Sequence, residues 1–315
     1  MKLGRAYELF VKYILINIGF SPVKSDGLYV FDGAPGQMIQ GLGEAHNADV
    51  LLEPPVQTPF FSRTRLLIEC KDYRQKVGLN TIRSALGLRE DINHFEIVDI
   101  NRLQGRQNQR RHGITYNYDR FSYQVAVAAF NGFTVPAQEF AATHRIPLLE
   151  FNKMPFWQDF CTLLGYQPAD FHRRPQWFIE QKEQVTEDQI IDFANEIGQH
   201  MAVAVTNSGQ LLFLYQISGE RNNFSDFYRL YWKTPSSPWI LESGNQTYLF
   251  QLPKSISQKW LENISSDFEL KAKAISCKAD FLSSMIVYYT INCLPAVKMI
   301  SIDEYALDIA KKQLE

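Results

Sequence analysis

Two hydrophobic periodicities along the first half of the chain predict an α/β fold. Residues 4–18 carry apolar side chains at helical spacing, and Gly19 ends this predicted helix. Short apolar runs at 48–52 and 65–71 predict two strands, and the proline-containing segment between them should connect the strands as a hairpin-like pair. Residues 125–130 are apolar at every position, which predicts a strand in the middle of a sheet covered by helices on both faces.

The remaining elements of the first half follow from shorter patterns. Thr134 is expected to cap the next helix, and Pro136 suits its first turn. The remaining predicted elements of the first half are a strand at 28–31, a glycine-rich loop at 33–43, a helix at 80–91, a helix at 137–144, a strand at 147–151 and a helix at 155–165.

The second half reads as a separate α+β domain. Thr186-Glu187-Asp188-Gln189 is a capping-box sequence that opens a helix ending at Gly198. Asn207-Ser208-Gly209 between two apolar runs predicts a hairpin. Further strands are expected at 228–232 and 248–252 and helices at 255–263 and 303–314, while 271–292 fits either a strand or a helix.

These patterns divide the chain into a first domain at residues 1–165 and a second at 166–315. Six aromatic residues of the second domain either form a binding surface or pack as ordinary core: Trp177, Tyr215, Tyr228, Tyr231, Trp232 and Trp239.

Composition narrows the classes of protein. A chain of 315 residues, 45% of them hydrophobic, is long enough for two buried cores. Its net charge of −2 means that any attraction to nucleic acid must come from a local patch. The four cysteines lie far apart without a CxxC pair, and the histidines form no HExxH pattern, which disfavours a disulfide scaffold and a zinc site. No signal-peptide pattern and no apolar run of membrane-spanning length occurs, so we expect a cytoplasmic protein without membrane contact.

The end of the run at 65–71 carries the candidate chemistry. Glu69 and Lys71 are two residues apart and so share one face of the predicted strand. Charged groups on a buried strand are costly unless opposite charges neutralise them. Asp49, inside the neighbouring strand, is expected beside Glu69, where a cation would relieve the repulsion between the two carboxylates. The alternative is that Asp49 caps a turn and Glu69 pairs with Lys71 or an arginine. Each residue alone fits that alternative, and the three together favour a metal site.

These residues resemble a known motif. Asp49 followed by Glu69-Cys70-Lys71 looks like the PD-(D/E)XK nuclease motif, although Ala48 stands where the motif has proline. The resemblance spans roughly residues 1–153 and is to the Mrr-like restriction endonuclease branch. Further segments carry it: Gly4-Arg5-Ala6-Tyr7-Glu8 with Gly19-Phe20, and 125–134, 137–144 and 146–151.

The resemblance implies a fold and a set of roles. The fold would be a restriction-endonuclease-like core, a mixed sheet flanked by helices, followed by the α+β domain. Asp49 and Glu69 would ligate Mg²⁺, for which Mn²⁺ would substitute, and Lys71 would orient or help deprotonate the attacking water. Glu8 would join the catalytic residues, whereas its position alone suggests a solvated surface acid.

Basic residues after the motif are candidate phosphate contacts. Arg74 and Lys76 follow Lys71 closely, and the segment 101–120 holds Arg106, Arg110 and Arg111 among tyrosines. Such a basic, aromatic-rich segment suits backbone contacts and base stacking. The alternative is a solvated loop whose arginines pair with acids elsewhere.

The expected function is therefore a Mg²⁺-dependent endonuclease that cuts DNA in restriction or antiphage defence. One alternative changes the substrate to RNA, as the effector subunit of a two-protein defence complex. Another keeps the nuclease fold as a catalytically silent nucleic-acid-binding module. The expected partners are nucleic acid, with DNA favoured over RNA, and either a second copy of the chain or a second defence protein.

Overall fold

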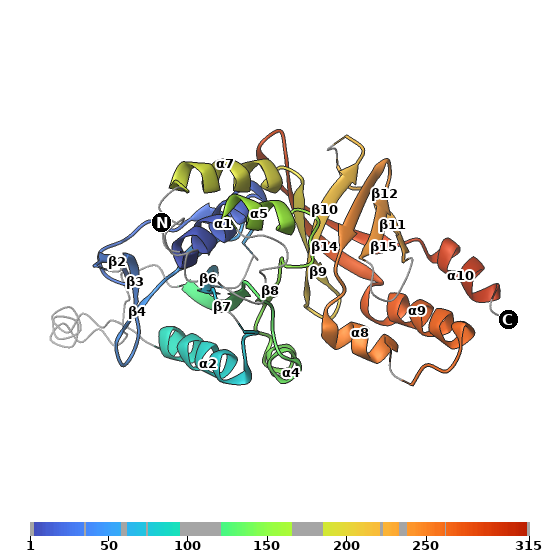
Figure 1. Cartoon of the computed structure of the whole chain (residues 1–315), viewed down its shortest axis with the longest axis horizontal. Helices are drawn as coiled ribbons and strands as arrows, with labels where there is room; N and C mark the ends of the chain where they lie inside the picture. The colour runs from blue at the N-terminus through green and yellow to red at the C-terminus, as the bar shows by residue number, and fades with distance from the viewer. Residues whose placement is uncertain are drawn as a thin grey trace, which may run out of the picture.

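The computed structural model describes residues 3–34, 36–57, 62–73, 75–94, 121–165, 185–220, 223–232, 238–261 and 263–313. The chain forms a mixed α/β structure with three sheets (Figure 1). The elements of the first half are α1 (Leu3–Asn17), β1 (Ser21–Pro22), β2 (Val30–Gly33), β3 (Gly36–Gln40), β4 (Ala45–Asn47), β5 (Val50–Glu53), β6 (Arg63–Lys71), α2 (Leu79–His94), β7 (Phe121–Ala129), α4 (Val135–His144), β8 (Leu148–Leu149) and α5 (Trp157–Leu163).

The elements of the second half begin with a helix and continue mainly as strands. They are α7 (Glu187–Gly198), β9 (Met201–Thr206), β10 (Leu211–Ser218), β11 (Phe227–Tyr231), β12 (Trp239–Ser243), β13 (Gln246–Phe250), α8 (Lys254–Leu261), α9 (Asp267–Phe281), β14 (Ser284–Ile291), β15 (Leu294–Ile302) and α10 (Glu304–Lys312).

A mixed five-stranded sheet forms the centre of the first half, in the order β1-β5-β6-β7-β8. The pairs β1–β5 and β5–β6 are antiparallel, whereas β6–β7 and β7–β8 are parallel. Helices α1 and α5 pack on one face, and α2 and α4 pack on the other. The predicted mixed sheet flanked by helices is thus confirmed at this coarse level.

Strand β7 is buried on both faces, as its uninterrupted apolar sequence predicts. Val125 through Ala129 have no exposed surface. Alternate residues of the strand contribute to the two separate hydrophobic cores above and below the sheet. The strand begins at Phe121, four residues before the predicted start.

The glycine-rich segment 33–43 is not a loop, contrary to the prediction. It contains β3, which pairs with β2 and β4 in a separate three-stranded antiparallel sheet. The cross-strand pair of Val30 and Ile39 buries both side chains, and this tertiary burial stabilises a strand that the glycines obscure in the sequence.

The second half contains a closed seven-stranded barrel, in the order β10-β13-β12-β11-β15-β14-β9. All neighbouring strands are antiparallel except β11 and β15, which are parallel. Figure 1 shows α8 and α9 together beside the barrel, and residues of both helices join its core. Tyr228 and Trp239 are buried in that core, whereas Tyr231 is exposed and Trp177 lies outside the described residues.

Several local predictions for the second half need correction. Strands β12 and β15 were not predicted, although each pairs with its neighbour in sequence across a two-residue turn, β12 with β13 and β15 with β14. The ambiguous segment 271–292 contains most of α9 followed by β14. In the first half, Thr134 stands at the N-cap of α4, but its hydroxyl makes no capping hydrogen bond.

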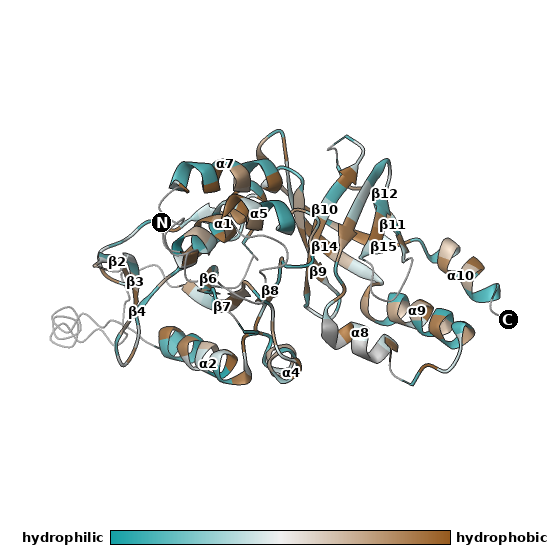
Figure 2. Cartoon of the chain, viewed as in Figure 1, coloured by the Kyte–Doolittle hydropathy of each residue, from teal (hydrophilic) through white to brown (hydrophobic). Residues whose placement is uncertain are grey.

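Helix α7 packs against α1, and so joins the core of the first half. The ring of Phe193, on α7, stacks on the rings of Phe10 and Phe160, with centroid distances of 6.1 Å and 5.9 Å. The Asn17 amide donates a hydrogen bond of 2.7 Å to the Asn195 side chain. In Figure 2, α2 and α7 carry both teal and brown residues, as expected for helices with one buried face. The domain boundary at 165/166 stays a prediction.

Candidate active site at the end of β6

The antiparallel pairing of β5 and β6 brings the first candidate residues together. Val50 lies opposite Ile68, and one further step of this register places Asp49, directly before β5, beside Glu69. Because the strands run in opposite directions, the start of β5 meets the end of β6 at one edge of the sheet. The sequence prediction that Asp49 lies beside Glu69 follows from this local pairing.

The Asp49 carboxylate is held by two hydrogen bonds. One oxygen accepts the backbone N–H of Cys70 at 2.8 Å, and the other accepts the Asn47 amide at 3.0 Å. The alternative in which Asp49 caps a turn therefore does not describe its contacts. These bonds orient the carboxylate toward the end of β6.

Glu69 and Lys71 form an ion pair at this edge. Lys71 Nζ lies 2.9 Å from Glu69 Oε2, and the two side chains are 21% and 18% exposed. Glu69 and Lys71 share one face of the strand, as predicted. Their ion pair is the contact expected under the alternative to a metal site, in which Glu69 pairs with Lys71. Both side chains retain access to solvent, so the pair is open to rearrangement when a ligand arrives.

Glu8 reaches the same site from α1. Its carboxylate lies 3.5 Å from Arg5, and its side chain is 25% exposed. Burial raises the pKa of Glu8 above its usual value, and the Asp49 carboxylate raises it further, whereas Arg5 lowers it. Glu8 therefore lies within electrostatic reach of Asp49, which the sequence position of Glu8 does not show.

The pKa values of Asp49 and Lys71 are both raised, but for different reasons. Burial raises the pKa of Asp49, against the N–H of Cys70 and the Lys71 ammonium, while Glu69 adds to the rise. Burial alone would lower the pKa of Lys71, but Glu69, and then Asp49 and Tyr73, outweigh it and raise the pKa. Lys71 is therefore a charged ammonium at neutral pH, which suits an electrostatic role better than that of a base.

Three residues of the site were missed by the sequence interpretation. Asp72 adds a further carboxylate that raises the pKa of Glu8. Asn47 orients Asp49, and Arg5 bridges Glu8 at 3.5 Å and Glu187 of α7 at 3.2 Å. The only sequence signal was adjacency: each of the three lies within three residues of a residue already chosen.

The candidate phosphate contacts are described only in part. Lys76 is exposed in the connection between β6 and α2, just before the parallel bridge of Val77 with Phe133. The predicted contacts Arg74, Arg106, Arg110 and Arg111 lie outside the described residues and stay predictions.

The donor set at this edge suits a hard cation, with two carboxylates as its core. Within the described part of the chain, no three His, Cys, Asp or Glu side chains group closely enough to hold a metal ion. Mg²⁺ needs only one or two protein carboxylates because it keeps several waters. Asp49 and Glu69 are each partly exposed, and the Glu69 carboxylate raises the pKa of Asp49, so these two are the candidate ligands.

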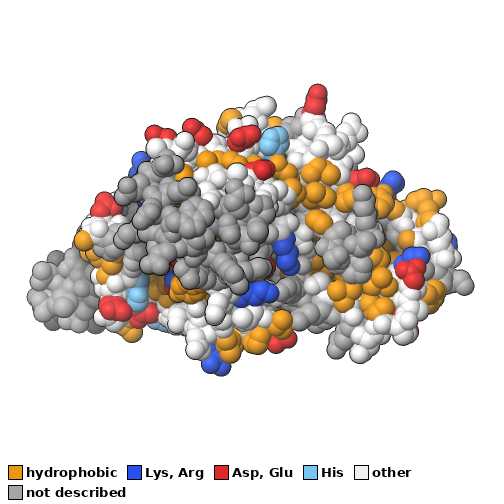
Figure 3. Space-filling model, in the orientation of Figure 1, with side chains coloured by type: hydrophobic (Ala, Val, Ile, Leu, Met, Phe, Trp, Pro, Cys, Tyr) orange, Lys and Arg blue, Asp and Glu red, His pale blue; other side chains and the backbone are white. Residues whose placement is uncertain are grey.

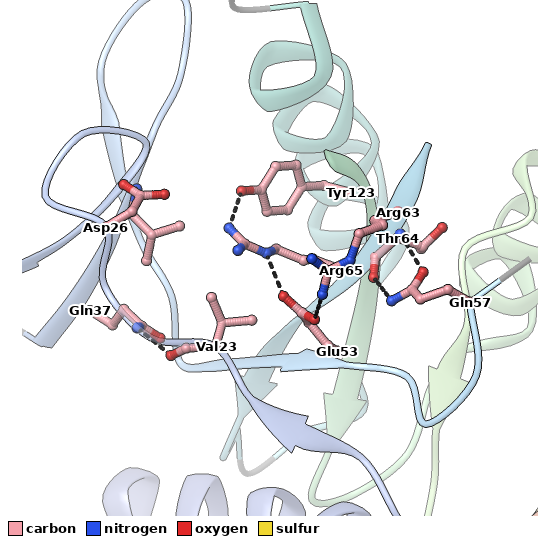
Figure 4. Close-up of polar contacts among 10 residues, drawn as sticks. Val23, Asp26, Gln37, Glu53, Gln57, Arg63, Thr64, Arg65 and Tyr123 are labelled. Atoms are coloured by element: carbon pink, nitrogen blue, oxygen red, sulfur yellow. Dashed lines mark hydrogen bonds and ion pairs between the residues drawn. The ribbon is translucent and has the colours of Figure 1, made fainter. Parts of the chain in front are cut away.

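At the other end of β6, Arg63 and Arg65 share the carboxylate of Glu53 (Figure 4). Arg65 is 7% exposed; its Nε donates to Glu53 at 3.1 Å and its Nη1 donates to the Tyr123 hydroxyl at 3.2 Å. Its guanidinium also lies 3.4 Å from the centre of the Phe121 ring, and Arg63 adds a 2.6 Å contact to Glu53. This cluster is a structural clamp between β5, β6 and β7, and it differs from the carboxylate-rich edge at Glu69.

Comparisons with known proteins give little further information. No family model matches the chain, and no curated protein matches it. None of the described helices is long and apolar enough to cross a membrane. The crystal structure of AF1548, a protein of unknown function, aligns with 61% of this chain and 91% of its own, at 15% sequence identity and a TM-score of 0.31. A similarity of this size supports no conclusion about fold or function.

Proposed function

We propose that this chain is a Mg²⁺-dependent endonuclease that hydrolyses phosphodiester bonds of DNA. The observation that carries the proposal is the grouping of Asp49, Glu69 and Lys71 at one edge of a mixed sheet, with Glu8 in electrostatic reach. The same three positions match the PD-(D/E)XK motif. The sheet flanked by helices also suits a restriction-endonuclease-like core. The setting in restriction or antiphage defence rests on the resemblance of residues 1–153 alone.

Each residue has a chemical role that its environment supports. Asp49 and Glu69 would hold the cation, and the Cys70 N–H and Asn47 keep the Asp49 carboxylate in place for that task. Mg²⁺, when bound, would lower the pKa of a coordinated water and polarise a phosphate oxygen. Glu69 keeps the Lys71 ammonium protonated. On substrate binding, Lys71 would break its ion pair with Glu69, orient the water and offset the negative charge that develops on the phosphate. Glu8, with its raised pKa, would provide a further carboxyl group beside Asp49.

The partly buried thiol of Cys70, beside the site, is poorly suited to act as the nucleophile. Burial raises the pKa of Cys70 well above its usual value, and the Asp49 and Glu8 carboxylates raise it further. A thiol with a raised pKa stays neutral at physiological pH and is a weak nucleophile. Water is therefore the group that would attack the phosphodiester.

The experiment incubates the full chain with linear DNA, circular DNA and total RNA, in Mg²⁺, Mn²⁺ or EDTA. We expect cleavage of linear and circular DNA with either metal and none in EDTA. Lys71→Ala should lower the rate by about 100-fold or more, because it removes a charge aimed at the reacting phosphate.

The matched control is Lys298→Ala. Lys298 also pairs with an acid, Asp226, at 2.8 Å and is 29% exposed, but it lies on the barrel. Its removal should leave the cleavage rate unchanged. Equal cleavage by Lys71→Ala and the parent chain would refute the mechanism. Cleavage of RNA alone would favour the RNA-cleaving alternative, and binding without cleavage would favour the silent module.

A further inference from the structure

A cavity of about 160 Å³ lies between the first half of the chain and the barrel. One wall comes from α4, β8 and the residues that follow β8, and the other from the β9–β10 hairpin and the residues after β13. Clefts between parts of a protein are common positions for small-molecule sites. This cavity lies apart from Asp49, Glu69 and Lys71, none of which lines it.

The inner walls are apolar and firmly packed. Leu148, Leu211 and Phe213 line the cavity, and Phe213 packs edge-on against Phe151 with 4.8 Å between ring centroids. A cavity of about 150 Å³ in another protein accommodates a benzene ring. The space here therefore suits one planar ring system.

Two cationic side chains stand at the cavity. Arg145 and Lys153 both line it, both are exposed, and neither makes an ion pair with any other described residue. Arg145 ends α4 in the left-handed conformation, with φ of 54°, and its backbone N–H bonds to the last turn of the helix. A residue other than glycine seldom adopts this conformation, which sets the direction of its side chain. Figure 3 shows Lys and Arg side chains near the middle of this face, where the two halves of the molecule meet.

Gln138 and Glu150 also line the cavity, together with the polar residues Ser208, Gln210 and Gln251. Gln138 is only 9% exposed, and its Oε1 has no hydrogen-bond partner among the described residues. A buried acceptor without a partner is costly, so native structures seldom retain one without a reason. Glu150 lies on the same cavity and presents carboxylate oxygens. The cavity thus combines cations, an apolar slot and acceptors that require N–H donors.

We propose that this cavity binds a nucleoside monophosphate. The base would enter the apolar slot, the phosphate would meet Arg145 and Lys153, and a change of rotamer would turn Gln138 Oε1, now buried from solvent, toward the exocyclic amine of the base. A dianionic phosphate suits two unpaired cations better than a single carboxylate does. The proposal does not depend on the nuclease assignment, since it concerns binding to a different set of residues.

Isothermal titration calorimetry of the full chain tests the proposal. The probes are cytidine monophosphate and adenosine monophosphate, which differ in base size, together with cytidine and inorganic phosphate. At least one nucleotide should bind at least tenfold more tightly than cytidine or phosphate. Gln138→Leu and Lys153→Gln should each weaken that binding about tenfold, a change that corresponds to about 1.4 kcal/mol.

The matched control is Lys311→Gln, which removes an exposed charge on α10 and should leave binding unchanged. Lys153→Gln changes a surface residue, so it keeps the test valid if Gln138→Leu folds poorly. Absence of saturable binding of both nucleotides overturns the proposal. Equal binding of nucleotide and cytidine overturns the role of the cations, as does equal nucleotide binding by Lys153→Gln and the parent chain.

Discussion

Arg65 and Lys71 point to the same face of β6, yet their surroundings give them different roles. Arg65 is nearly buried, and Glu53, Tyr123 and Phe121 hold its guanidinium within the fold. Lys71 has one ion-pair partner and retains exposure beside further carboxylates. At the scale of residues, burial and the number of partners separate a structural cation from a candidate catalytic one.

Removing Arg65 should therefore destabilise the protein. We expect Arg65→Leu to lower the free energy of unfolding by about 3 kcal/mol, because it leaves the partly buried Glu53 with only Arg63. Arg63 is 53% exposed, so Arg63→Ala should cost less than about 1 kcal/mol. Urea denaturation of both variants measures the difference, and equal losses would contradict the distinction.

The raised pKa values of Glu8 and Asp49 predict a pH dependence of stability. A carboxyl group whose pKa is raised on folding binds its proton more tightly in the folded state, so it makes folding less favourable as the pH rises. The loss should begin near the unfolded pKa of about 4 and end above the folded pKa. Glu8→Gln should flatten this fall in urea denaturation between pH 4 and 8, whereas the exposed Glu139→Gln should not.

A bound divalent cation should offset the loss of stability that the ionised carboxylates cause at neutral pH. Mg²⁺ at ten times its dissociation constant would stabilise the parent chain by about 1.4 kcal/mol at neutral pH. Asp49→Asn should abolish that stabilisation in thermal unfolding, because it removes a charge that would bind the ion. Equal stabilisation of parent and variant would place the ion elsewhere.

At the scale of elements, helix caps show how similar sequence signals differ in effect. Thr186 and Gln189 form both hydrogen bonds of a capping box at the start of α7. Thr134 occupies the same position at α4 but makes no such bond. Thr186→Ala should lower the free energy of unfolding by about 1 kcal/mol, and Thr134→Ala by much less. Denaturation of the two variants, read by circular dichroism, compares them.

At the scale of the whole molecule, the first core extends past the predicted domain boundary. Ile190 and Ala194 of α7, and Met201, Val203 and Phe213 of the barrel strands, belong to the same buried cluster as α1 and α5. A fragment that ends at 165 therefore exposes surface that the full chain buries.

Truncation tests this arrangement. We expect the fragment 1–165 to bind a hydrophobic dye and to lose cooperative unfolding, because Phe10 and Phe160 no longer have Phe193 above them. The fragment 1–200 should recover part of the loss, since it contains α7. Equal thermal stability of the two fragments would support an independent domain at 1–165.

The sequence by itself determined the local parts of this protein. Alternation along β6 placed Glu69 and Lys71 on one face, and the short connection from β5 to β6 placed Asp49 beside them, because strand period and hairpin pairing depend on nearby residues. The buried strand β7 and the capping box of α7 were also evident, since each is a pattern within a few residues.

Only the tertiary structure decided the features that join distant segments. The approach of Glu8 to Asp49, the packing of α7 on α1, the parallel pair that closes the barrel and the cavity between the two halves all depend on contacts across long stretches of chain. No local pattern encodes such contacts, because burial in the assembled core, and not intrinsic propensity, selects them.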